Sequence, residues 1–184
     1  LVACTYASNT TGSIVDMPRV IRAVKTGCDA LVYIDAVHYA PHQLIDVQTL
    51  GCDLLVTSAY KYFGPHLGVL YAKTEVLEHL QPYKVAPAKD LNPNRWETGT
   101  QNYAALAGFI AAIDYLAALS SDCRLSRREQ LTDSYRKIVS YEKALSAQFI
   151  SRLAAYPQVQ IFGISDATAS DRRTPTFAFR IHHT

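Results

Sequence analysis

The stretch "ALVYIDAVHYAPHQLIDVQTLGCDLLVTSAYK" (residues 30–61) predicts the fold class. Residues 30–35 and 53–58 are short, continuous apolar runs, which are typical of strands buried on both faces of a sheet. Residues 44–51 between them read as a short helix closed by a glycine. Strands that alternate with helices indicate an α/β protein, with a largely parallel sheet covered by helices on both faces.

The same alternation continues on both sides of this stretch. Residues 1–5 and 69–73 are further predicted strands, and predicted helices run from Pro18 to Gly27 and over residues 74–80. After a proline-rich connector (residues 81–94), residues 102–119 form a predicted helix that is apolar nearly all round, so we expect it to be deeply buried. A second long helix ends near Pro157, and two strands follow at 158–162 and 176–181. One face of that long helix is marked by Leu131, Tyr135, Ile138, Tyr141, Leu145, Phe149 and Leu153.

The change from α/β alternation to a long helix and further strands predicts a domain boundary within residues 115–155. We expect residues 1–115 to be the C-terminal part of a large domain, 116–155 a connecting long helix, and 156–184 the start of a small C-terminal domain. The chain starts and stops on strand-like residues, and a domain rarely begins or ends inside its own sheet. We therefore expect a segment of a longer protein, inactive alone.

Composition argues against several classes of partner. A formal charge of +2 gives no reason to expect nucleic acid, and no apolar run approaches the roughly 20 residues of a membrane helix. No signal peptide is recognisable. The four cysteines lack CxxC or metal-like spacing, so they predict no metal site and fit reduced thiols in a cytoplasmic protein. They are Cys4, Cys28, Cys52 and Cys123.

Polar residues follow the predicted strands at the edge where open α/β sheets gather reactive groups. They are Asn9, Asp35, Ser58 and Lys61, with His38 close by. A carboxylate at the end of an apolar strand is costly unless it meets a cation or a protonated nitrogen. Lys61 is either an ordinary surface lysine or a desolvated amine used as a nucleophile towards a carbonyl.

Together these residues are the parts needed to hold pyridoxal phosphate: a Schiff-base lysine, an acid for the ring nitrogen, and the hydroxyls of Ser58 and Tyr60 for the phosphate. Each is weak evidence singly, because an Asp at a strand end is more often a turn residue and a lone His is more often structural. Their order favours the cofactor hypothesis: Asp-x-x-His at one strand end and Ser-x-x-Lys at the next.

The run "YIDAVHYAPHQLIDVQTLGCDLLVTSAYKYFGPHLGVLY" (residues 33–71) resembles the cofactor-lysine region of class V aminotransferases, most closely the cysteine desulfurase-like group. "SNTTG" (8–12) and "RWETGTQN" (95–102) resemble two other elements of that family. The resemblance covers about residues 1–120 and implies a fold-type-I pyridoxal-phosphate enzyme, with residues 1–115 in its large cofactor-binding domain. His38, Tyr60 and the turn after Lys61 depart from the usual desulfurase pattern, which favours a desulfurase-like subgroup over a housekeeping desulfurase.

The resemblance implies roles for the residues at the ring of the cofactor. Lys61 would form the Schiff base and move protons at the substrate α-carbon. Asp35 would keep the pyridine nitrogen protonated, and His38 would hydrogen-bond the ring oxygen. Asn9 would lie near that oxygen or the substrate carboxylate.

The resemblance also implies partners. Ser58 and Tyr60 would bind the phosphate, and Thr100 would reach the phosphate of the neighbouring subunit in a homodimer. The implied reaction is desulfuration of L-cysteine to alanine and a persulfide, with a sulfur-acceptor protein as a further partner. The alternatives are a class V aminotransferase or epimerase acting on another amino acid, and a non-catalytic paralogue that keeps the fold. The catalytic cysteine, the substrate-carboxylate arginine and the ring-stacking residue are expected outside residues 1–184.

Overall fold

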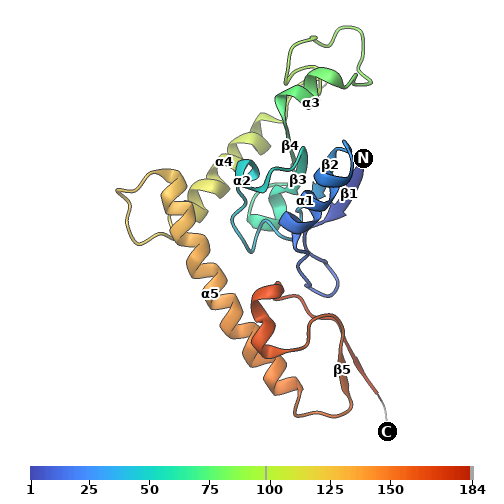
Figure 1. Ribbon diagram of the computed structural model, residues 1–184. Coiled ribbons are helices and arrows are strands. Elements are labelled where there is room, and N and C mark those ends of the chain that lie inside the picture. The colour runs from blue at the N-terminus through green and yellow to red at the C-terminus, as the bar shows by residue number, and fades with distance from the viewer. Residues whose placement is uncertain (98, 183–184) are drawn as a thin grey trace.

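The main sheet has four strands in the order β1-β2-β3-β4 (Figure 1). The computed structural model describes residues 1–97 and 99–182. Strands β1 (Val2–Thr5), β2 (Val32–Asp35) and β3 (Leu54–Ser58) are parallel, and β4 (Gly68–Ala72) pairs antiparallel with β3. The predicted α/β class and the largely parallel sheet are therefore confirmed.

Local capping explains where the first helices begin. Helix α1 (Met17–Gly27) starts where the side chain of Asp16 accepts a hydrogen bond from the Arg19 amide. Helix α2 (Val47–Leu50) is shorter than predicted, because the Asp46 side chain caps it two residues after the expected start. It ends at Gly51, whose φ of 76° is the left-handed conformation that glycine adopts without strain.

One hydrophobic cluster lies between α1 and the sheet. Met17 of α1 packs with Val32 and Ile34 of β2, and all three are fully buried. Tyr33 is half-buried and Asp35 is exposed, so within the described chain β2 is fully covered on one face only. The predicted burial of this strand on both faces is therefore wrong for this chain.

A second cluster joins the sheet to the long helices. The one-turn helix η1 (Ala59–Tyr62) follows β3 directly, and its Tyr62 packs with Leu116 of α4 (Tyr103–Ala117) and Tyr135 of α5 (Arg127–Leu153). The Tyr135 hydroxyl donates to the Ala40 carbonyl at 2.8 Å, and burial raises the pKa of Tyr135 to about 12. These contacts fix the segment after β2 against α5.

The prediction that the apolar helix is deeply buried is wrong. Helix α4 contacts η1 and α5, but its Tyr103, Ile110 and Tyr115 are 70%, 54% and 52% exposed. Within the described residues, the Phe63 ring meets the Tyr115 ring edge-on, with centroids 5.4 Å apart, and both rings stay exposed.

Helix α5 carries the C-terminal part of the chain away from the sheet (Figure 1). It begins in a capping box formed by Ser126 and Glu129. At its far end, β5 (Val159–Ile161) and β6 (Phe179–Ile181) form a separate antiparallel pair, and the short helix η2 (Ala167–Arg172) lies along α5. The division into residues 1–115, 116–155 and 156–184 stays a prediction.

The remaining elements bear less directly on the site. Helix α3 (Thr74–His79) follows β4, and residues 81–97 contain neither helix nor strand, as predicted for the proline-rich connector. None of the helices in the described part of the chain has the combined length and apolarity required to cross a bilayer.

Candidate active site

A cavity of about 330 Å³ lies at the carboxyl ends of the parallel strands. Thr5 at the end of β1 is in register with Asp35 at the end of β2, and β3 leads into η1 beside them. The cavity brings together five of the predicted site residues: Asn9, Asp35, His38, Tyr60 and Lys61. Its remaining lining residues are Thr5, Ala7, Ser8 and Val37.

Asp35 is exposed to the cavity. Its Oδ1 accepts a hydrogen bond from the Val37 amide at 2.9 Å, which begins the turn after β2. Within the described residues, Oδ2 has no hydrogen-bond partner. Asp35 is thus both a turn residue and a cavity carboxylate.

His38 lies on that turn. Tyr39 stacks on Tyr6 with ring centroids 3.7 Å apart, which fixes the turn against the end of β1. His38 Nε2 lies 2.9 Å from Thr176 Oγ1 and 3.1 Å from Thr174 Oγ1. Burial lowers the pKa of His38, and the nearby His42 and Lys61 lower it further. The imidazole is therefore held in its neutral form more strongly than a free histidine.

Lys61 lies on the one-turn helix η1. The turn closes through Phe63, whose φ of 68° costs a non-glycine residue about 1 to 2 kcal/mol. Lys61 is exposed, and its Nζ lies 5.4 Å from the centroid of the Tyr60 ring, which stacks on His66. The described residues therefore place the amine at the cavity without desolvating it.

The loop after β1 forms another wall. The Ser8 hydroxyl accepts hydrogen bonds from the amides of Thr10 and Thr11. Asn9, which follows Ser8, is exposed at the cavity. Gly12 has a φ of 75°, and a Cβ there would lie 2.4 Å from the Thr176 carbonyl oxygen. Only glycine fits this close approach between the loop and the C-terminal part of the chain.

Two predicted site residues lie away from the cavity lining. Ser58 ends β3 opposite Gly68, and within the described residues its hydroxyl makes no hydrogen bond. Thr100 is exposed in the segment before α4. The four cysteines are unpaired thiols, and none lines the cavity in the described part of the chain.

Sequence reasoning missed several residues of the site. Thr5 could have been found, because it ends a strand parallel to the one that ends at Asp35. Thr174 and Thr176 could not, because no local pattern links them to a histidine more than 130 residues earlier.

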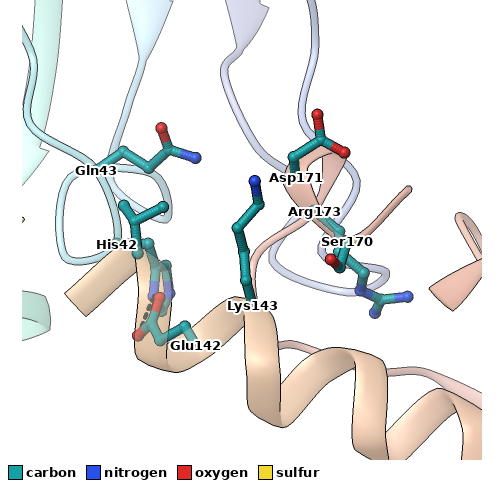
Figure 2. Close-up of a pocket in the computed structure, with 8 residues that line it drawn as sticks. His42, Gln43, Glu142, Lys143, Ser170, Asp171 and Arg173 are labelled. Carbon is teal, nitrogen blue, oxygen red and sulfur yellow. Dashed lines mark hydrogen bonds and ion pairs between the residues drawn. The ribbon is translucent and has the colours of Figure 1, made fainter. Parts of the chain in front are cut away.

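A smaller cavity of about 120 Å³ lies on the α5 side of the same turn (Figure 2). His42 Nδ1 contacts both carboxylate oxygens of Glu142 at 3.0 Å, which ties the turn to α5. Figure 2 shows Lys143 rising from α5 between Gln43 and Asp171. The His42–Glu142 contact is one more that fixes the turn carrying His38, which lies four residues before His42.

The whole chain, residues 1–184, matches the family model described as aminotransferase class-V. It is 31% identical over 176 residues to a cysteine desulfurase of Dickeya dadantii, covering 89% of this chain and 39% of that protein. The structure resembles the cysteine desulfurase CsdA of Escherichia coli (TM-score 0.71, 26% identity, 97% of this chain and 42% of the other). It also resembles an apo cysteine desulfurase of Thermococcus onnurineus (TM-score 0.79, 21% identity, 98% and 44%).

The parallel sheet, the cavity at its carboxyl edge and these neighbours define the fold as fold type I of the pyridoxal-phosphate-dependent transferases. The chain belongs to the class V aminotransferase family. It spans about two fifths of the length of the desulfurases that it resembles.

Proposed function

We propose that the full-length protein is a pyridoxal-phosphate-dependent cysteine desulfurase that converts L-cysteine to alanine and a persulfide. The observation that carries this proposal is the cavity that joins Lys61, Asp35, His38 and Asn9 at the carboxyl edge of the sheet. The similarity to cysteine desulfurases supports the choice of substrate.

The residues present fit the ring end of the cofactor. The cavity lies within the size range of small-molecule sites. It combines an amine, an imidazole and a carboxylate whose second oxygen has no partner among the described residues. When bound, pyridoxal phosphate supplies an electron sink at the substrate α-carbon. The Tyr60 hydroxyl is the phosphate donor on the cavity wall, and Ser58 remains a proposed donor at the end of β3.

Each side chain has a defined task in this proposal. Lys61 Nζ holds the cofactor covalently and then moves a proton at the substrate α-carbon. The Asp35 carboxylate keeps the pyridine nitrogen protonated, and His38 donates to the ring oxygen. Asn9 binds near that oxygen or the substrate carboxylate.

Desulfuration also needs a thiolate that lies outside the residues described. The Cβ–Sγ bond of cysteine breaks, the sulfur joins an enzyme thiolate as a persulfide, and Cβ takes a proton to give alanine. None of Cys4, Cys28, Cys52 and Cys123 lines the cavity, so we place this thiolate in another part of the full-length protein. The unpaired thiols support the proposal of a cytoplasmic enzyme that passes sulfur to an acceptor protein.

Incubating the full-length protein with L-cysteine and a reductant tests this reaction. We expect equal amounts of alanine and sulfide, measured by amino-acid analysis and sulfide assay. Transfer of the amino group to a keto acid without sulfide, or inversion of an amino acid, would favour the alternative aminotransferase or epimerase. No turnover of any amino acid, with the cofactor bound, would favour a non-catalytic paralogue.

We further propose a homodimer in which Thr100 donates to the phosphate in the neighbouring subunit. The exposed Thr100 and the exposed large apolar side chains of α4, which begins three residues later, support this arrangement. An isologous contact would build two such shared sites at once.

Mixing Lys61→Ala chains with Thr100→Val chains of the full-length protein tests the shared site. A mixed dimer then has one site with both changes and one with neither, so we expect part of the activity to return. Subunit exchange is confirmed by mass spectrometry of differently tagged chains. If exchange occurs and activity does not return, Thr100 does not act across the interface.

A further inference from the structure

The Tyr60 ring is held at the cavity by a second ring from the loop after η1. Tyr60 lines the cavity and is 44% exposed. Its ring stacks on the ring of His66, with centroids 4.8 Å apart and an angle of 17° between the planes. Within the described residues, the Tyr60 hydroxyl makes no hydrogen bond. The stack with His66 is therefore a contact that holds the ring and leaves the hydroxyl free.

Backbone contacts fix the loop that carries His66. The Gly64 amide donates to the Ala59 carbonyl at 2.8 Å, and the Ala59 amide donates to the Leu67 carbonyl at 2.8 Å. A Cβ on Gly64 would lie 2.9 Å from the Ala59 carbonyl oxygen, so the loop packs tightly against the buried Ala59. Residues 63–67 are thus folded back on η1, which brings His66 beside Tyr60, six residues earlier.

This arrangement limits the directions in which the Tyr60 hydroxyl can point. A partly exposed tyrosine can occupy more than one rotamer, and a nearly parallel stack on a fixed ring favours one of them. The side chain is then ordered before a ligand enters the cavity, so binding does not have to order it.

We propose that His66 is a positioning residue, which holds the Tyr60 ring so that its hydroxyl is presented to the phosphate of the cofactor. The inference rests on the proposed function, in which Tyr60 donates to that phosphate. His66 acts in it through the stacking of its ring and not through a hydrogen bond from its nitrogens.

Titration of the full-length protein with two forms of the cofactor tests this role. The bound cofactor is first removed with hydroxylamine. The protein is then titrated with pyridoxal phosphate and, separately, with pyridoxal, which has the same ring and aldehyde but no phosphate. Each Kd is measured by absorbance. The ratio of the two Kd values isolates the contribution of the phosphate, and a general loss of structure would weaken both ligands alike.

In His66→Ala the preference for pyridoxal phosphate over pyridoxal should fall by about two- to tenfold, the range for loss of one aromatic pair. In His66→Phe the stack remains, so the preference should stay close to that of the unsubstituted protein. His79→Ala is the matched control, because His79 is an exposed histidine at the end of α3, and its loss should change neither Kd. If His66→Ala does not fold, judged by circular dichroism, His66→Ser takes its place.

A double substitution shows whether His66 acts through Tyr60. Tyr60→Phe should lower the preference roughly tenfold or more, as for loss of a hydrogen bond to a charged group. Adding His66→Ala to Tyr60→Phe should lower it no further, because no hydroxyl is left to position.

Three results would overturn the role of His66: an unchanged preference in His66→Ala, additive losses in the double variant, or an equal loss in His66→Phe, which would indicate that the imidazole binds the phosphate itself. An unsubstituted protein that binds pyridoxal phosphate no more tightly than pyridoxal would overturn both this role and the proposed phosphate site. Because the titrations contain no amino acid, they do not depend on the desulfurase reaction. A protein that fails the cysteine assay but shows the expected pattern keeps the role of His66 and loses the reaction.

Discussion

The full-length Lys61→Ala protein is expected to lose turnover by at least about 10³-fold, because one amine both holds the cofactor and moves the proton at the substrate α-carbon. Lys61 is the one lysine that lines the cavity in the described part of the chain. Reduction of the unsubstituted protein with borohydride should fix the cofactor on Lys61, as measured by mass spectrometry of the labelled peptide.

Lys89→Ala is the matched control. Lys89 is exposed in the connector between α3 and α4, far in sequence from the cavity residues, so its loss should leave turnover and labelling unchanged. A label on Lys73 or Lys84, or turnover by Lys61→Ala within tenfold of the unsubstituted protein, would contradict the role of Lys61.

Substitution of Asp35 by asparagine should lower kcat roughly 10²- to 10³-fold, the range for loss of one preorganised electrostatic contact. The structure makes this a clean change, because an asparagine Oδ1 can still accept the Val37 amide and preserve the turn. The substitution therefore removes the negative charge that keeps the pyridine nitrogen protonated and leaves the turn unchanged. Cofactor content, measured by absorbance after release in alkali, separates slow turnover from poor binding.

Asp29→Asn serves as the control for Asp35→Asn, since Asp29 is exposed in the loop between α1 and β2. It should turn over at the normal rate. The role of Asp35 would be excluded by an Asp35→Asn protein that is fully loaded with cofactor and turns over near-normally.

The sequence predicted those parts of the site that depend on local signals. Asp35 and Lys61 follow apolar strands, and parallel strands bring their carboxyl ends to one edge, so their meeting in one cavity could be foreseen. The exposure of Asp35 could not be foreseen, because the burial of a strand residue depends on what packs against the sheet and not on the strand itself.

Long-range contacts escaped prediction for a physical reason. Thr174 and Thr176 contact His38 only because α5 and η2 return the chain to the loop at Gly12, and no periodic pattern specifies that path. The prediction that α4 is deeply buried failed for a related reason. An all-round apolar helix signals that its surface will be covered, but it does not say whether this chain or another covers it.

The return of the chain to Gly12 also determines the order in which the contacts of the site form during synthesis. The strands β1 to β4 and η1 are complete by residue 72, so the edge that carries Asp35 and Lys61 can form early on the ribosome. The imidazole of His38 gains its threonine partners only after residue 176 has emerged, more than 100 residues later. A contact of such sequence separation forms late, because closing a long loop costs entropy before the contact offsets it. The nascent chain therefore presents the lysine and the aspartate before the histidine beside them is locked in place.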